Sequence, residues 1–149
     1  MNPSLLGNPF AFKDTRLCLT KKVAKRLLAE AQEAFPDEYS ALLYGKGATI
    51  SGHIPMPAHT ADAHSFRWDG PSFLAGLRHI HEAGQEWLGV LHSHPSTPPL
   101  PSAKDEQGWH YPTLSYWILG LSTRDPEWKV YRWENEGFSE CAYLLADCT

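Results

Sequence analysis

Residues 86–105 read EWLGVLHSHPSTPPLPSAKD and join an apolar strand pattern to a cluster of polar side chains. The first half predicts a central strand, which Pro95 ends. Because side chains alternate along a strand, His92 and His94 are expected on one face at its exposed end. The proline-rich loop that follows is stiff, and it can return Asp105, on the first turn of the next helix, to the two imidazoles.

Two histidines and one aspartate supply three protein ligands, which leaves one tetrahedral position for water, as in catalytic zinc sites. Nitrogen and carboxylate ligands favour zinc, and iron, cobalt and manganese stay open as alternatives. A purely structural interpretation also exists, because Ser102 and Asp105 match a helix-capping pattern. The combination of a histidine pair, a stiff loop and this Ser-x-x-Asp pattern favours the metal site over capping alone.

Outward from this stretch, hydrophobic periodicity predicts strands and helices along the chain. Strands are expected at residues 16–20, 38–45, about 48–58, 86–92, 114–121, 128–133 and 138–145, the last two joined by a turn at 135–137. Helices are expected at 21–35, from 71 to about 84, and at 102–110. Thr20 is expected to cap the first helix and Pro36 to stop it. This mixed order predicts an α/β (α+β) fold, with a single mixed β-sheet flanked by helices.

The apolar residues of the first two predicted helices recur at helical spacing, so each helix is expected to have one buried face. The first face comprises Val23, Leu27, Leu28, Ala31 and Phe35, and the second comprises Phe73, Leu74, Leu77 and Ile80.

The composition fits one domain over residues 1–149. Its 42% hydrophobic content excludes global disorder, and no run approaches the roughly 18 apolar residues of a membrane span. A net charge of −4 argues against a general nucleic-acid binder. The N-terminal residues lack the pattern of a secretory signal, and Cys18, Cys141 and Cys148 fit reduced thiols in a cytoplasmic protein.

HSHP, six residues and SAKD together resemble the His-x-His-Pro-x6-Ser-x-x-Asp signature of the JAMM (MPN-plus) metallopeptidases. These are zinc isopeptidases that remove ubiquitin and ubiquitin-like proteins. The family also has a glutamate upstream, in a strand of the type Glu-x-Cys-Gly-Leu-Leu-x-Gly. Here PDEYSALLYG supplies Glu38, Leu42, Leu43 and Gly45 in matching places, while Ser40 and Ala41 replace the cysteine and glycine. The resemblance covers nearly the whole chain, is greatest to short prokaryotic members, and implies the JAB/MPN (cytidine-deaminase-like) architecture.

The resemblance implies a role for each residue of the signature. His92, His94 and Asp105 would hold one catalytic zinc ion, which lowers the pKa of a bound water to around 7. Glu38 would take the proton of that water as general base and later pass it to the leaving amine. Ser102 would help to stabilise the oxyanion on the carbonyl of the terminal glycine of the substrate. No acyl-enzyme forms, so the cysteines need no catalytic role.

The partner implied by the family is a ubiquitin-like protein or its conjugate, together with activating and conjugating enzymes encoded in the same operon. Sulfur-carrier pathways and antiviral conjugation systems both fit. A JAMM peptidase with another peptide substrate is an alternative, and a metal-free MPN scaffold is a weaker one, because scaffolds lose ligand positions and this chain keeps all five polar residues.

The remaining histidines and one tryptophan are expected to lie outside the metal site. His53, His59 and His64 are expected in an exposed loop within residues 46–70, which could instead form a flap over the substrate tail. His79 and His81, two apart on a helix, face different directions and make a poor metal pair. Trp109 is expected in the core.

Overall fold

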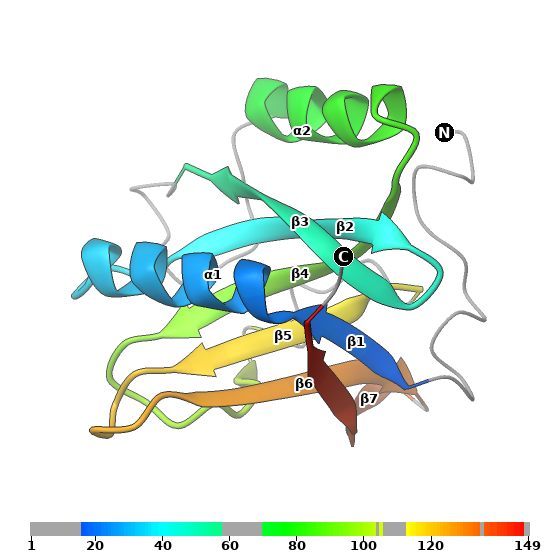
Figure 1. The fold of residues 1–149 in the computed structure, drawn as a ribbon. Helices are drawn as coiled ribbons and strands as arrows, with labels where there is room; N and C mark the ends of the chain where they lie inside the picture. The colour runs from blue at the N-terminus through cyan, green and yellow to red at the C-terminus, as the bar shows by residue number, and fades with distance from the viewer. Residues whose placement is uncertain (1–15, 58–69, 104, 106–112, 135, 148–149) are drawn as a thin grey trace.

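The computed structural model describes residues 16–57, 70–103, 105, 113–134 and 136–147. Two helices and eight strands occur in these ranges. Figure 1 shows how they are arranged in space. In chain order they are β1 (Leu17–Thr20), α1 (Lys21–Ala34), β2 (Ser40–Lys46), β3 (Thr49–Met56), α2 (Gly70–Glu82), β4 (Glu86–His94), β5 (Ser115–Gly120), β6 (Glu127–Glu134), β7 (Gly137–Cys141) and β8 (Tyr143–Ala146). Most of the predicted helix at 102–110 and the segment 58–69 lie outside the described residues.

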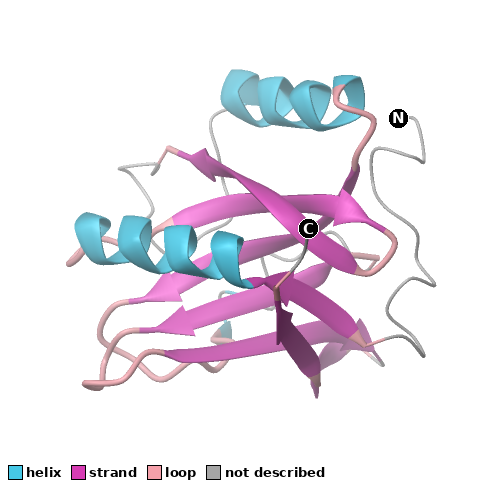
Figure 2. Ribbon diagram, viewed as in Figure 1, coloured by secondary structure: helices cyan, strands magenta, loops and turns pink. Residues whose placement is uncertain are grey.

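All eight described strands belong to one mixed sheet, in the order β7-β6-β5-β4-β2-β3-β1-β8. Figure 2 shows the strands in magenta and the helices in cyan. The central strand β4 runs antiparallel to β2 and parallel to β5. Strand β1 runs parallel to both of its neighbours, β3 and β8. The predicted single mixed sheet with flanking helices is therefore confirmed.

The predicted strand at 138–145 is divided in two, which corrects the sequence-based prediction. Strand β7 pairs with β6 at one end of the strand order, and β8 pairs with β1 at the other end. Only Ala142 separates the two strands, so the sheet must curl until its edges come close, as Figure 1 shows. Residues 138–145 carry no turn signal, because the chain changes its pairing partner there without reversing direction.

The two helices cover opposite faces of the sheet, and successive residues of β4 alternate between the two cores. The core under α1 includes Leu27, Leu88 and Leu91. The core under α2 includes Ile80 and Val90. Because β4 is covered on both faces, it reads as a nearly continuous apolar run up to its polar end.

The predicted cap of the first helix is confirmed, because the Thr20 hydroxyl accepts a hydrogen bond from the Val23 N–H (3.3 Å). The helix ends at Ala34, before Pro36. Phe35 was expected on the buried face, and this is wrong. Phe35 lies beyond the last helical turn and is 53% exposed.

Leu74 was also expected on a buried face, and at 61% exposure it is not. Helix α2 instead turns Gly76, Leu77 and Ile80 inward. A β-carbon at position 76 would lie 2.9 Å from Leu42 Cδ1, so the glycine allows the helix to approach the sheet closely. No helix in the described ranges is long and apolar enough to span a membrane.

Candidate metal centre

The two histidines of the HSHP motif lie at the end of the central strand. Strand β4 extends beyond its predicted end at residue 92, so both His92 and His94 belong to it and share one face. Both are buried, at 4% and 5% exposure, and their ring centroids are 5.9 Å apart. The strand therefore places both imidazoles on one face of the sheet, close enough together to contact one ion.

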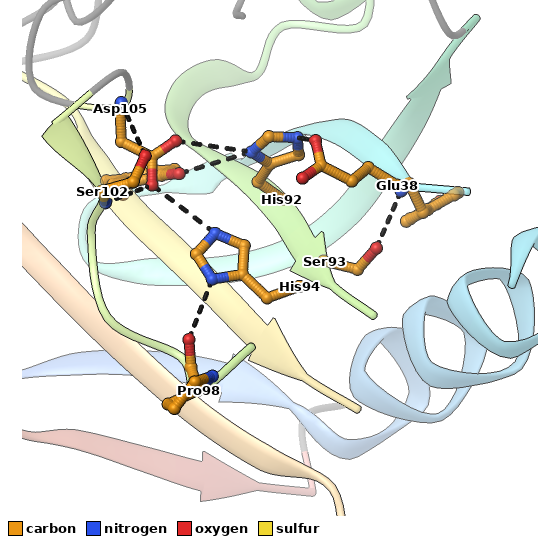
Figure 3. Close-up of polar contacts among 9 residues, drawn as sticks. Glu38, His92, Ser93, His94, Pro98, Ser102 and Asp105 are labelled. Atoms are coloured by element: carbon orange, nitrogen blue, oxygen red, sulfur yellow. Dashed lines mark hydrogen bonds and ion pairs between the residues drawn. The ribbon is translucent and has the colours of Figure 1, made fainter. Parts of the chain in front are cut away.

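The loop after β4 brings Asp105 to these rings, as Figure 3 shows. Its Oδ2 lies 3.5 Å from His94 Nε2, and its Oδ1 lies 4.0 Å from His92 Nδ1. One potential ligand atom from each of the three residues can be chosen so that all lie within 4.8 Å of one another. No other group of three or more histidine, cysteine or acidic residues in the described chain is placed to hold a metal ion.

Ser102 and Asp105 form a capping box, in which the side chain of each residue accepts a hydrogen bond from the backbone N–H of the other. The Ser102 N–H donates to Asp105 Oδ2 (2.8 Å), and the Asp105 N–H donates to the Ser102 hydroxyl (3.1 Å). The capping interpretation and the metal interpretation of these two residues are therefore compatible. The cap is what fixes the carboxylate in the position that faces the histidines.

The proline-rich loop is fastened to the sheet by specific contacts. His94 Nδ1 lies 2.9 Å from the Pro98 carbonyl oxygen, and the Tyr131 hydroxyl donates to the Pro99 carbonyl oxygen (2.7 Å). A carbonyl oxygen only accepts, so Nδ1 of neutral His94 must carry the proton and Nε2 keeps its lone pair. Gly120 lets the loop approach, because a β-carbon there would lie 2.9 Å from the Pro99 ring.

Glu38 reaches the same site from the segment that leads into β2. Its Oε2 lies 2.8 Å from His92 Nε2, and its side chain is 15% exposed. The next residue, Tyr39, is tied to β4 by two hydrogen bonds: its N–H donates to the Ser93 hydroxyl (2.7 Å), and its carbonyl accepts from the Ser93 N–H (2.8 Å). Ser93 thus links the segment carrying Glu38 to the strand carrying both histidines (Figure 3).

A cleft of about 580 Å³ opens onto this group. Its lining comprises Pro36, Asp37, Glu38, His94, Pro95, Ser96, Thr97, Ser102, Ala103 and Asp105. The polar cluster is therefore accessible to a substrate from one side, although its histidines are nearly buried.

The protein environment stabilises charge on His94 and Asp105. Burial alone would lower the pKa of His94, but its hydrogen bonds to Asp105 and to the Pro98 carbonyl raise that pKa above its ordinary value. Burial alone would raise the pKa of Asp105, but hydrogen bonds from His94 and the Ser102 backbone lower it. The carboxylate therefore stays ionised, as a metal ligand must be, and a bound cation would displace a proton from His94.

All five polar residues singled out in the sequence, Glu38, His92, His94, Ser102 and Asp105, converge on this cleft or its immediate wall. Two nitrogen ligands and one carboxylate, buried and within reach of one another, fit a transition-metal ion.

The expectation for His53 is wrong. This residue lies in β3, and its Nε2 forms a short ion pair with Glu30 Oε2 (2.6 Å), with only 10% of its side chain exposed. His79 lies in α2 and meets the Tyr44 ring edge-on, away from the metal group. The expectations for His59, His64 and Trp109 concern positions outside the described residues.

Sequence reasoning missed three residues that support the site: Tyr39, Ser93 and Tyr116. The Tyr116 hydroxyl lies 3.4 Å from His92 Nδ1. These residues sit inside apolar strand patterns, and only the fold brings their polar atoms to the site. Nothing local in the sequence indicates them.

A curled mixed sheet carries, at the end of its central strand, a buried His-His-Asp group that could hold a metal ion and lies beside an open cleft. A family model described as prokaryotic homologs of the JAB domain matches residues 20–134, which contain all five polar residues. The chain belongs to this family. The resemblance to JAMM proteins deduced from the HSHP and SAKD motifs is therefore confirmed.

Several known proteins are similar over most of the chain. The Desampylase of Haloferax volcanii is 26% identical over 138 residues, covering 88% of this chain and 97% of the relative. The solution structure of a Desulfitobacterium hafniense protein is 31% identical, with a TM-score of 0.78, and covers 88% of this chain and 93% of that one.

Two more distant structures show the same fold. A JAB1/MPN domain protein from Archaeoglobus fulgidus is 21% identical with a TM-score of 0.61, covering 88% of this chain and 100% of that one. A structure described as JAMM, a metalloprotease-like zinc site in the proteasome and signalosome, is 20% identical with a TM-score of 0.58, covering 89% and 100%.

Proposed function

We propose that the chain is a zinc-dependent isopeptidase or peptidase that cleaves after the C-terminal glycine of a ubiquitin-like protein. The observation that carries this proposal is the placement of Glu38 beside the His-His-Asp group, with its Oε2 2.8 Å from His92 Nε2. In hydrolytic metal sites, unlike structural ones, three protein residues bind the metal and a further carboxylate, which is not a ligand, lies beside them as general base. Glu38 occupies such a place beside the His-His-Asp group.

His92, His94 and Asp105 would hold the zinc ion. When bound, zinc supplies Lewis-acid chemistry, lowering the pKa of water and polarising a carbonyl oxygen. The Glu38 carboxylate accepts a proton from the attacking water and delivers it to the leaving amine. The Ser102 hydroxyl accepts the Asp105 N–H through a lone pair, so its own proton can be donated to the carbonyl oxygen of the substrate.

The substrate assignment has separate support. The Haloferax relative bears the name Desampylase, a name for an enzyme that removes a ubiquitin-like modifier, and it matches this chain over nearly its full length. The cleft beside Glu38 also includes Ser102 and Asp105 in its lining, so a peptide bound there would lie next to the proposed metal ligands.

The test uses the ubiquitin-like protein encoded nearest to the gene, fused through its terminal glycine to a reporter protein. We expect zinc-loaded protein to release the reporter at that glycine, and a zinc chelator to stop the release. The variant Glu38→Gln should keep its zinc and lose at least about 100-fold in rate, as expected for loss of a general base. Release is followed by gel electrophoresis, and the cleavage position by mass spectrometry.

Glu33→Gln is the matched control, because it makes the same chemical change on the exposed face of α1. Its rate should equal that of the unmodified protein. Normal turnover by Glu38→Gln would remove Glu38 as the base. If zinc-loaded protein cleaves no ubiquitin-like fusion, the substrate must be another peptide. If the protein binds no zinc, the result favours a non-catalytic scaffold over an enzyme.

A further inference from the structure

Tyr116 is the second residue of β5 and is fully buried. It pairs with Val90 across the parallel β4–β5 ladder, and its ring packs against Phe138 at a centroid distance of 5.1 Å. Its hydroxyl lies 3.4 Å from His92 Nδ1. The Asp105 carboxylate is a further hydrogen-bond partner of the same hydroxyl.

The directions of these hydrogen bonds follow from the groups involved. A phenol has one proton to donate and lone pairs to accept, whereas an ionised carboxylate only accepts. The Tyr116 hydroxyl therefore donates to Asp105, while its oxygen remains within reach of His92 Nδ1. One phenol group thus contacts His92 and Asp105 together.

His94 Nδ1 has a different partner, the Pro98 carbonyl oxygen. The protein therefore contacts Nδ1 of each histidine, at 3.4 Å from the Tyr116 hydroxyl for His92 and at 2.9 Å from the Pro98 carbonyl oxygen for His94. The Pro98 contact is made by the loop, but the Tyr116 contact is made by the core of the sheet. Tyr116 also joins two of the three ligands, whereas Pro98 contacts one.

We propose that Tyr116 is a positioning residue of the metal centre, whose hydroxyl links His92 to Asp105 and holds the imidazole and the carboxylate in their relative positions. This inference rests on the proposed zinc site but not on the proposed substrate. Residues that orient metal ligands from behind typically change metal affinity or activity by about 10- to 100-fold when they are removed.

The test is Tyr116→Phe, which removes the hydroxyl and keeps the ring that packs on Phe138. Zinc affinity is measured by competition with a chromophoric chelator, using metal-free protein. Cobalt is substituted in parallel, because its visible spectrum reports the ligand geometry. Circular dichroism of the metal-free variant checks the fold. We expect zinc to bind about 10- to 100-fold more weakly and the cobalt spectrum to change in intensity.

Tyr143→Phe is the matched control. Tyr143 lies in β8, and its ring packs against Trp117, which belongs to the core on the opposite face of the sheet. This variant loses the same atom and should bind zinc within about twofold of the unmodified protein, because it touches no residue that orients a ligand.

Zinc affinity of Tyr116→Phe within about twofold of the unmodified protein, with an unchanged cobalt spectrum, would overturn the positioning role. Unmodified protein that binds no zinc would overturn it together with the proposed metal site. Failure to cleave any ubiquitin-like fusion would contradict the substrate alone, and a selective loss of zinc affinity in Tyr116→Phe would still support the positioning role.

Discussion

The two halves of β4 are buried to nearly the same degree, but different interactions hold them. From Trp87 to Leu91 the strand is apolar and is fixed by packing on both faces. From His92 to His94 it is polar, and its side chains meet specific atoms of other segments: Glu38 and Tyr116, the Tyr39 backbone, and the Pro98 carbonyl with Asp105.

The difference teaches how one strand can contribute both to the core and to the candidate metal centre. Burying apolar surface stabilises the fold without regard to direction, so in the first half apolar side chains of similar volume can replace one another at modest cost. Burying a polar atom is costly unless a partner is present in the correct direction. The polar half is therefore determined by chain segments far away in the sequence. Residues 91, 92 and 93 allow the comparison to be tested at adjacent positions.

The largest expected effect comes from His92→Ala. Removing one of three protein ligands should abolish both metal binding and cleavage while the sheet still forms, because packing does not depend on the imidazole. Asp105→Ala should behave in the same way. Elemental analysis gives the metal content and circular dichroism the fold. Full zinc occupancy in either variant would show that the ligand assignment is wrong.

The next effect is expected at the neighbouring residue, with the opposite profile. Leu91→Ala removes a fully buried side chain from the core under α1 and should lower the free energy of unfolding by about 2–5 kcal/mol. The variant that remains folded should still bind one equivalent of zinc. Urea denaturation of metal-free protein measures the loss of stability. A folded Leu91→Ala protein without zinc would mean that packing and ligand placement are not separable along β4.

The smallest effect is expected for Ser93→Ala, which tests the link between the two functions of the strand. The buried Tyr39 N–H loses its acceptor, which costs about 1–3 kcal/mol of stability. Because Tyr39 holds the segment carrying Glu38, kcat should fall while KM and zinc content stay unchanged. Ser122→Ala, an exposed position, is the control. Equal kcat values for the two variants would exclude Ser93 as a support for Glu38.

The apolar half of β4 and the convergence of polar residues at its end were predictable from sequence, because each depends on a local pattern. Alternation predicted the strand, and the spacing of His92, His94, Ser102 and Asp105 predicted that these residues lie together. The partners of the polar atoms were not predictable in this way. Tyr116 reads as one more apolar residue of a buried strand, and its hydroxyl meets His92 only because β4 and β5 pair in a particular register.

The errors have the same origin. Phe35 and Leu74 continue the helical spacing of apolar residues, but the helix ends before the first and turns the second outward. His53 lacks a local signal for burial, since its partner Glu30 comes from α1. The break at Ala142 is set by which strand has a free edge, and this depends on the assembled sheet.

The pairing of β1 with β8 has a consequence for how the protein is made. Leu17 lies opposite Tyr143 and Thr20 opposite Ala146, so β1 and β8, the first and last described strands, pair in parallel. On the ribosome, the segment from Glu38 to Asp105 emerges well before β8. The centre of the sheet can then assemble during synthesis, but β1 can pair with β8 only after β8 has emerged. Pairing between strands so far apart in the sequence slows folding. The addition of β8 is therefore expected to be the step that completes the sheet.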